Sequence, residues 1–244
     1  MKVLLVGNGG REHAIARALV RTSTPEHPVA LVVQAGNPAL EQLGRSLTMD
    51  PMDPGDVVRR ATSENVDLVV VGPEAPLVAG VADAVLDYGI PVFGPTKGAA
   101  RLEASKSFAK EIMADAGVAT ARSFTCTTME EVSAAFDELG APHVVKDDAL
   151  AAGKGVVVTS DREEASAHAR ACLARDGGAV VVEDYLDGPE VSLFCVADGE
   201  TVVPLQPAQD FKRVGDGNEG PNTGGMGAYS PLPWLPEEAT QRIV

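Results

Sequence analysis

Apolar and polar residues in the first hundred positions alternate between short apolar runs and stripes at helical spacing. The apolar runs, each of strand length, cover residues 2–6, 29–33, 66–71 and 90–93. Helical stripes lie between them, one beginning at Ala14 and one over residues 81–88. Because strands and helices alternate, we predict an open, doubly wound parallel sheet of the α/β class.

Two glycine-containing turns follow strands of this predicted sheet. One covers residues 7–10, after the first strand, and the other covers residues 72–74, after the third. Ligands of open α/β sheets bind at the carboxyl ends of the strands. The two turns are therefore a candidate ligand site.

The pattern changes near residue 100. A helical stripe begins at Phe108, and capping boxes at Thr128-x-x-Glu131 and Ser160-x-x-Glu163 predict two further helices. Strands are predicted at residues 143–146, 155–159, 180–183 and 191–196. This second region is α+β, and we place the domain boundary between residues 102 and 103. A last helix predicted from residue 235 stops at 244, which leads us to expect a longer parent protein.

Composition and charge exclude several classes of protein. The chain has 244 residues, a net charge of −15, and 1 Trp, 3 Tyr and 6 Phe. An acidic chain with few aromatic rings lacks the cationic surface of a nucleic-acid binder. No apolar run approaches the roughly 18 residues of a membrane span, and the N-terminal run is too short for a signal peptide. A cytoplasmic, monomeric protein is expected.

Cysteine and histidine carry no metal or disulfide signal. The 3 Cys are odd in number and far apart, and the 4 His have no metal-ligand spacing. We interpret them as packing residues, and no metal ligand is predicted in this chain.

The first candidate motif is residues 7–13 (GNGGREH). The dinucleotide fingerprint G-x-G-x-x-G requires glycine at position 12, where this chain has Glu12, so an NAD-dependent oxidoreductase is a weak alternative. Gly9 and Gly10 could still present backbone N–H groups to an anion at a helix N-terminus. A tight turn that needs glycine only for its dihedral angles remains an equal interpretation.

The second candidate is residues 146–155 (KDDALAAGKG), which lie between two predicted strands. They do not fit the P-loop pattern G-x-x-x-x-G-K-[ST]. A loop of small residues can fold over a polyphosphate while Lys146 and Lys154 neutralise its charge. An ordinary exposed hairpin is the alternative.

Two later segments have the polar composition of binding sites. Residues 183–190 (EDYLDGPE) follow an apolar strand and could offer backbone groups to an adenine and an acid to ribose hydroxyls. Residues 209–213 (QDFKR) and 220–231 (GPNTGGMGAYSP) are predicted to form a long functional loop, because so many glycines are costly in a mere connector. Met226, Tyr229 and Trp234 are candidates to anchor it.

The segments 7–13, 72–77, 150–155 and 220–231 occur in one order along the chain. Together they resemble the glycinamide ribonucleotide synthetase family (phosphoribosylamine–glycine ligases) of the ATP-grasp superfamily. The resemblance covers all 244 residues, but only the first half to three-fifths of a full-length member. It implies a Rossmann-like substrate-binding domain over residues 1–102. An incomplete ATP-grasp region over residues 103–244 would follow, with a lid subdomain at about 123–192.

The resemblance also implies a reaction and its residues. Such enzymes join glycine to 5-phosphoribosylamine through a glycyl phosphate and split ATP to ADP and phosphate. ATP binding is implied for Lys106, Lys146, Ala151, Ala152, Gly153, Lys154, Gly155, Glu183, Asp184, Tyr185, Leu186 and Glu190. Substrate binding is implied for Gly9, Gly10, Glu74, Asp210, Lys212, Arg213, Asn222, Thr223, Gly224 and Gly225. Catalytic roles are implied for Lys146, Asp210, Lys212 and Arg213.

This chain departs from the family pattern at two points. Ala149 stands where the family has glycine, which would strain the chain if that position needs a positive φ. The family's Mg²⁺ or Mn²⁺ ligands belong to a later segment that this chain lacks, so we expect the chain to be inactive alone. A non-catalytic, nucleotide-binding ATP-grasp pseudoenzyme is the alternative function.

Overall fold

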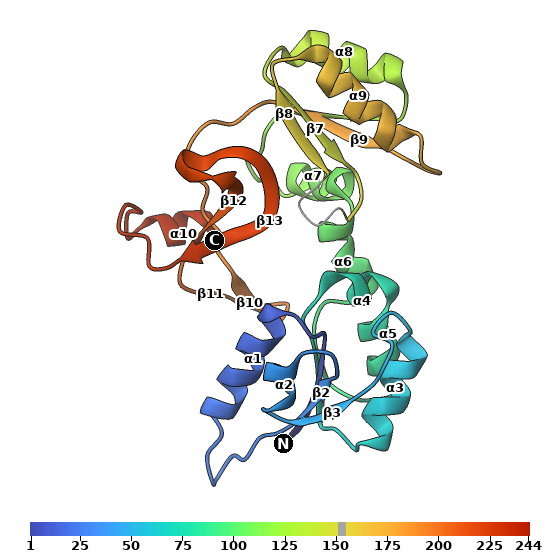
Figure 1. The fold of residues 1–244 in the computed structure, drawn as a ribbon, viewed down its shortest axis with the longest axis vertical. Coiled ribbons are helices and arrows are strands. Elements are labelled where there is room, and N and C mark those ends of the chain that lie inside the picture. The colour runs from blue at the N-terminus through green and yellow to red at the C-terminus, as the bar shows by residue number, and fades with distance from the viewer. Residues whose placement is uncertain (151–154) are drawn as a thin grey trace. The chain divides into compact units, whose positions relative to one another are not determined.

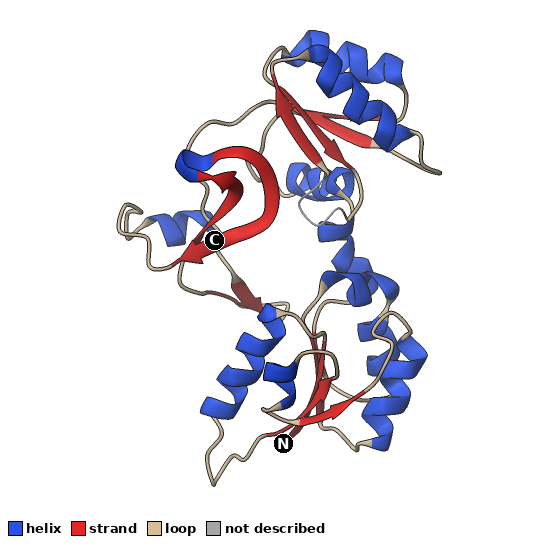
Figure 2. Cartoon of the chain, viewed as in Figure 1, coloured by secondary structure: helices blue, strands red, loops and turns tan. Residues whose placement is uncertain are grey.

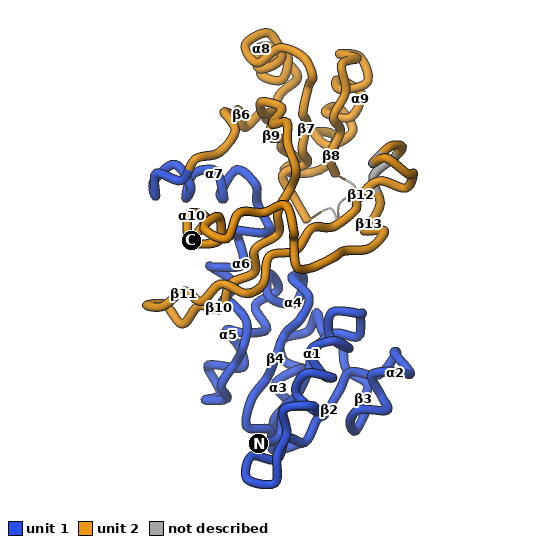
Figure 3. The backbone as a smooth tube through the Cα atoms, turned by 90° about the vertical axis from the view of Figure 1, so that its left-hand side faces the viewer, with its two compact units in different colours: residues 1–118 blue, residues 119–244 orange. Residues whose placement is uncertain are grey.

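The computed structural model describes residues 1–150 and 155–244. They form two compact units, unit 1 at residues 1–118 and unit 2 at residues 119–244 (Figure 3). The sequence placed the boundary at 102/103, so the two divisions differ by helix α7 (Lys106–Asp115), which belongs to unit 1.

Unit 1 contains a five-stranded sheet in the order β3-β2-β1-β4-β5 (Figure 1). Every neighbouring pair is parallel, as the sequence predicts. The strands are β1 (Lys2–Val6), β2 (Ala30–Gln34), β3 (Arg45–Leu47), β4 (Leu68–Val71) and β5 (Val92–Phe93). From β1, the chain adds β2 and β3 on one side and then β4 and β5 on the other. Because β1 and β4 are parallel neighbours, the turns that follow them lie side by side at one edge of the sheet.

Helices cover both faces of this sheet (Figure 2). They are α1 (Gly10–Arg21), α2 (Pro38–Glu41), α3 (Pro54–Ser63), α4 (Glu74–Ala79), α5 (Val81–Asp87) and α6 (Lys97–Ala104), followed by α7. Val3 and Leu5 pack with α1 and α2, whereas Leu4 and Val6 pack with α3 to α6. Successive strand residues point to opposite faces, so the continuous apolar runs follow from burial on both sides.

Unit 2 begins with a four-stranded antiparallel sheet in the order β6-β9-β7-β8. Its strands are β6 (Ser123–Cys126), β7 (His143–Asp147), β8 (Val156–Thr159) and β9 (Val180–Glu183). Helices α8 (Met129–Leu139) and α9 (Arg162–Leu173) pack on one face, against Val145 and Val182 among others. Lys146 and Glu183 alternate with these residues and therefore point to the opposite face.

The predicted cap of α8 is confirmed and that of α9 is wrong. Thr128 Oγ1 accepts the Glu131 N–H at 3.2 Å, and the Glu131 carboxylate accepts the Thr128 N–H at 3.2 Å. Helix α9 is capped by Asp161, whose carboxylate accepts the Glu163 N–H at 2.8 Å. Asp and Ser are both good N-caps, and the adjacent Asp161 takes the position predicted for Ser160.

His143 is buried against the Phe136 ring, with ring centroids 4.4 Å apart. Within the described residues, its Nδ1 atom is buried and has no hydrogen-bond partner. Burial, and then the positive charge of Arg162, lower the pKa of His143. The folded chain therefore takes up this proton at lower pH than the unfolded chain, whose histidines titrate near pH 6.5.

Because the folded pKa is the lower one, His143 should cost stability as pH falls below about 6.5, by at most about 1.4 kcal/mol per pH unit. Between pH 7 and pH 5.5, we expect the free energy of unfolding, measured with urea, to fall less in His143→Phe than in the wild type. His27→Phe, at an exposed histidine, is the matched control and should keep the wild-type slope. An unchanged slope in His143→Phe would contradict this assignment.

The last third of the chain forms two small antiparallel sheets and a short helix. The elements are β10 (Cys195–Ala197), β11 (Val202–Pro204), β12 (Gln209–Gly215), the 3₁₀ turn η1 (Asp216–Asn218), β13 (Glu219–Tyr229) and α10 (Ala239–Ile243). Strand β10 is shorter than the predicted strand at 191–196, since only an isolated bridge from Ser192 to Ala208 precedes it. Helix α10 likewise begins four residues after the predicted start.

The predicted long loop at 209–231 is wrong, because most of it is the hairpin β12–β13. The pairing has register shifts near Lys212 and Val214, and Gly220, Gly225 and Gly227 adopt positive φ within β13. Glycine has low strand propensity, so the sequence does not signal a strand that uses glycines for its irregular turns. From the described residues, no helix is long and apolar enough to cross a membrane.

Candidate functional site

In unit 1, the turns after β1 and β4 are tied together by side chains. The Arg11 guanidinium donates to the Gly72 carbonyl at 2.7 Å and pairs with Glu74 at 3.4 Å. The Gly9 N–H donates to the Glu12 carboxylate at 2.7 Å. The structure thus brings the segments of Gly9, Gly10 and Glu74 together, while their role as substrate-binding residues stays a prediction.

Glu12 is buried between the two turns. A Cβ atom on Gly72 would lie 2.1 Å from Glu12 Oε1, and one on Gly7 would lie 2.8 Å from Glu12 Cγ. These glycines are therefore required by the close approach of Glu12, whose carboxylate also occupies the Gly9 N–H. Glu12 stands where the dinucleotide fingerprint has its third glycine, and its carboxylate takes a backbone N–H of the turn. This arrangement disfavours binding of NAD.

In unit 2, Lys146 pairs with Glu183 on the face of the sheet opposite to α8 and α9. Lys146 stands opposite Val181 in the register, so it reaches Glu183 diagonally across β7 and β9. The lysine side chain is 32 % exposed and that of Glu183 is 8 % exposed. A buried carboxylate thus holds a partly exposed cation at the end of a strand, where it could meet an anionic ligand.

The segment that joins β7 to β8 is only partly described. The predicted ATP-binding residues Ala151, Ala152, Gly153 and Lys154 lie outside the described residues. Gly155 accepts the Asp147 N–H at 2.8 Å. Among the described non-glycine residues only Asn65 has a positive φ, so Ala149 does not carry the strain that its substitution for glycine suggested.

Lys106 is the first residue of α7 in unit 1, where Ser105 caps the helix by accepting the Phe108 N–H at 3.1 Å. The other predicted phosphate lysine, Lys146, belongs to unit 2. Its contribution to a common phosphate site stays a prediction.

The predicted adenine-binding segment leaves the sheet at the end of β9. Asp184 pairs with Arg122 at 3.3 Å, its N–H donates to the Arg122 carbonyl at 2.9 Å, and Arg122 also pairs with Glu138 at 3.0 Å. The Asp184 carboxylate raises the pKa of the Arg122 guanidinium. Tyr185 and Leu186 are exposed. Sequence reasoning missed Arg122, because its partner lies 62 residues away and nothing local marks it.

Two of the predicted catalytic residues of β12, Lys212 and Asp210, lie in a row of charges with Glu190. The Lys212 ammonium pairs with Glu190, the predicted ribose acid, and lies 3.9 Å from the Asp210 carboxylate. Arg213 donates to the Gly220 carbonyl at 3.2 Å. The structure therefore joins the segment after β9 to the hairpin β12–β13 through Lys212.

The glycine-rich strand β13 holds the other predicted substrate residues. Thr223 Oγ1 donates to the Lys212 carbonyl at 2.9 Å and accepts the Gly225 N–H at 3.0 Å. Asn222 stands opposite Arg213 in the register, and Gly224 follows Thr223 along the strand. These bonds fix the backbone beside Lys212, while a role in substrate binding stays a prediction.

Two of the three proposed anchors hold this hairpin. Tyr229 stacks on Phe211 with ring centroids 5.7 Å apart, and its hydroxyl donates to Gln209 at 2.7 Å. The Trp234 indole N–H donates to the Tyr229 hydroxyl at 2.8 Å. Met226 is exposed and does not serve this purpose.

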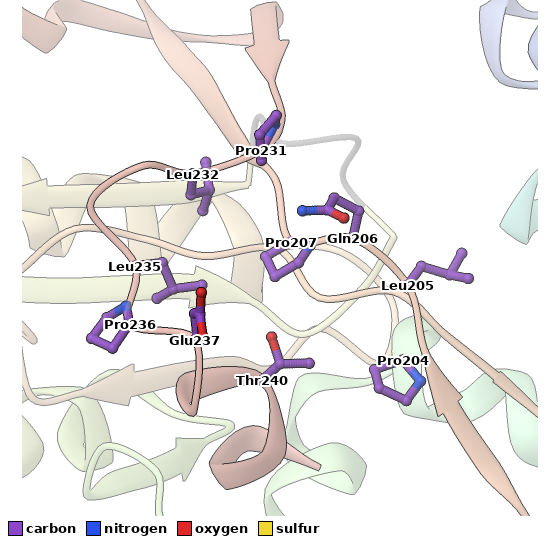
Figure 4. A pocket seen from close by; sticks show the side chains of 10 residues that line it. All are labelled: Pro204, Leu205, Gln206, Pro207, Pro231, Leu232, Leu235, Pro236, Glu237 and Thr240. Atoms are coloured by element: carbon purple, nitrogen blue, oxygen red, sulfur yellow. The ribbon is translucent and has the colours of Figure 1, made fainter.

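A pocket of about 420 Å³ lies below this hairpin (Figure 4). It is lined mainly by prolines and leucines: Pro204, Leu205, Gln206, Pro207, Pro231, Leu232, Leu235, Pro236, Glu237 and Thr240. Its lining includes no cation and none of the predicted site residues. A polyphosphate needs cations or converging N–H groups, so this pocket is not the nucleotide phosphate site.

The part of the chain that the structure describes shows no cluster of candidate metal ligands. Over residues 1–150 and 155–244, no three His, Cys, Asp or Glu side chains come together as a candidate metal site. The free Cys126 and Cys172 are buried, and burial raises the pKa of the Cys126 thiol to about 11. A neutral, buried thiol is a poor metal ligand.

Comparison with protein-family models decides the family. Residues 1–103 match the phosphoribosylglycinamide synthetase N domain, and residues 104–244 match the phosphoribosylglycinamide synthetase ATP-grasp (A) domain. The chain belongs to the phosphoribosylglycinamide synthetase family. This assignment confirms the resemblance read from the four ordered motifs.

Curated relatives within this family are similar along the whole chain. A phosphoribosylamine–glycine ligase of Streptomyces coelicolor is 59 % identical over 244 residues, which is 100 % of this chain and 57 % of the relative. A ligase of the same name from Mycobacterium leprae is 56 % identical and is covered to 58 %. The chain therefore spans somewhat more than half the length of the curated relatives it matches.

Solved structures agree with the family fold. The crystal structure of a phosphoribosylamine–glycine ligase from Thermotoga maritima has a TM-score of 0.82 at 30 % identity, over 100 % of this chain and 58 % of that one. An N5-carboxyaminoimidazole ribonucleotide synthetase from Thermus thermophilus has a TM-score of 0.70 at 20 % identity, over 100 % of this chain and 61 % of that one. The second likeness concerns the fold alone. Both support the predicted Rossmann-like and ATP-grasp architecture.

Proposed function

We propose that this chain is the nucleotide- and substrate-binding portion of a phosphoribosylamine–glycine ligase. The reaction joins glycine to 5-phosphoribosylamine and yields glycinamide ribonucleotide, ADP and phosphate. The observation that carries the proposal is the Lys146–Glu183 pair, a partly exposed cation held by a buried acid at the end of β7. The curated relatives named as this ligase support the choice of substrates.

The chemistry needs charge neutralisation more than a covalent nucleophile. A glycine carboxylate oxygen attacks the γ-phosphorus of ATP, and ADP leaves. The amine nitrogen of phosphoribosylamine then attacks the carbonyl carbon of glycyl phosphate, loses a proton, and releases phosphate. Lys146 would neutralise negative charge on the phosphates during the transfer. Its positive charge would position the γ-phosphoryl group and stabilise the transition state of the transfer.

The charges on β12 suit the other substrates. Lys212 and Arg213 supply positive charge for a carboxylate or phosphate, and Asp210 supplies an acceptor for an amine. Glu190 reaches Lys212, so the predicted ribose contact and the predicted substrate contact would share one ion pair. Mg²⁺ or Mn²⁺ is expected for the longer relatives, whereas the described residues of this chain show no cluster of candidate metal ligands.

The test is an assay of ADP release with ATP, glycine and phosphoribosylamine, run on the 244-residue chain and on a chain of the relatives' length. We expect the longer chain to release ADP only when both glycine and phosphoribosylamine are present, and the shorter chain to bind ATP without release. ADP release that does not depend on glycine would contradict the proposal. ATP binding without turnover in the longer chain would favour the pseudoenzyme alternative.

A cytoplasmic, monomeric protein stays an expectation.

A further inference from the structure

The end of helix α9 is attached to the strand that carries Lys146. Arg175, two residues after α9, pairs through its guanidinium with the Asp147 carboxylate, the last residue of β7. The Arg175 Nε–H also donates to the Cys172 carbonyl at 3.3 Å, at the carboxyl end of the helix. One side chain therefore connects the end of α9 to the residue next to Lys146.

The residue just before the neighbouring strand β8 contacts the same helix. His168 Nε2 on α9 lies 3.2 Å from the Gly155 carbonyl oxygen, which also accepts the Asp147 N–H. A carbonyl only accepts, so His168 Nε2 is the donor in this contact. The end of β7 and the residue before β8 are thus both held against α9, on the face opposite to Lys146.

Burial makes the Asp147–Arg175 pair more than a surface contact. The Asp147 side chain is 6 % exposed and that of Arg175 is 51 % exposed. A buried carboxylate is costly without a cation, so the loss of Arg175 would favour a displacement of Asp147 at the end of β7. Because consecutive residues of a strand move together, a displacement of Asp147 displaces Lys146.

We propose that Arg175 is a positioning residue, which acts through Asp147 to hold Lys146 where it binds nucleotide phosphates. This inference rests on the proposed function, since that function assigns Lys146 to the phosphates. In this role Arg175 does not itself touch the substrate. Its effect should therefore appear in the affinity for phosphate groups and not in the affinity for the nucleoside.

The test compares ATP and adenosine binding by calorimetry in the 244-residue chain, at a temperature well below unfolding. Arg175→Gln should weaken ATP binding about tenfold, as a small misplacement of a binding group does, and leave adenosine binding within about twofold. Arg175→Lys, which keeps the charge, should recover most of the loss. Arg170→Gln is the matched control, because Arg170 lies on the same helix but pairs with the exposed Glu163.

A purely structural role predicts another outcome. If Arg175→Gln lowers the melting temperature but leaves ATP affinity within twofold of wild type, the proposal is wrong. If Arg175→Gln does not fold, the double variant Asp147→Asn/Arg175→Gln takes its place in the comparison of ATP and adenosine affinities, because it removes both charges of the pair. Lys146→Ala separates this proposal from the proposed function. If Lys146→Ala itself leaves ATP affinity unchanged, the phosphate site fails; if only Arg175→Gln leaves it unchanged, the positioning role fails.

Discussion

Replacing Lys146 by alanine should raise the dissociation constant for ATP about 100-fold. A hydrogen bond to a charged group contributes about 1.5–3 kcal/mol, and each 1.4 kcal/mol corresponds to a factor of ten. Two causes act in the same direction here. The variant loses the cation, and it leaves the nearly buried Glu183 carboxylate without that cation, so negative charge faces the phosphates.

The two causes can be separated with a second variant. Lys146→Met/Glu183→Gln removes both charges, so it should bind ATP more tightly than Lys146→Ala but more weakly than the wild type. Arg170→Ala removes one positive charge elsewhere in unit 2 and should leave the dissociation constant within about twofold, because an exposed ion pair contributes little. Calorimetric titration with ATP gives all four values. Equal affinities of Lys146→Ala and wild type would remove Lys146 from the phosphate site.

Replacing Gly72 by alanine should destabilise unit 1 by about 2–3 kcal/mol. The added Cβ would lie 2.1 Å from Glu12 Oε1 and 2.6 Å from Glu12 Cγ, closer than any real contact. Overpacking a buried site typically costs about 1–3 kcal/mol, and moving the carboxylate would also break its 2.7 Å bond to the Gly9 N–H. Urea unfolding, followed by a probe in unit 1, measures the change.

The control is a glycine in the same motif with open space around it. A Cβ on Gly10 meets nothing within 4 Å, so Gly10→Ala should change stability by less than about 1 kcal/mol. Glu12→Ala combined with Gly72→Ala tests the cause, since the clash disappears and the loss should be smaller than the sum of the single losses. Strictly additive losses would show that Glu12 is not what excludes a side chain at Gly72.

The polar residues of the candidate site were foreseen more completely than their contacts. Lys146, Glu183, Glu190 and Lys212 were all named from motifs, and the structure joins them into two ion pairs. Arg122 and Arg175 were not, although Arg122 pairs with the predicted site residue Asp184 and Arg175 pairs with Asp147, next to Lys146. Each arginine lies in a short connection between elements, and nothing in its local sequence marks a partner that lies 28 or 62 residues away.

The amino-acid sequence alone determined the parallel sheet, the two glycine turns at its edge and the family. The apolar runs at β1 and β4 can be recognised in the local sequence. Burial on both faces of a parallel sheet explains why they are continuous. The Thr128–Glu131 cap was equally readable, because both partners lie within one helical turn.

The tertiary structure alone decided the register of β12 against β13 and the burial of Glu12 beside Gly72, whereas the choice of Asp161 over Ser160 as a cap was a competition between adjacent residues. The physical reason is that local propensity describes how a residue affects its own backbone. These features depend instead on which other group contacts the residue in the folded chain. For the hairpin, glycine propensity even pointed the wrong way, and pairing across the two strands prevailed.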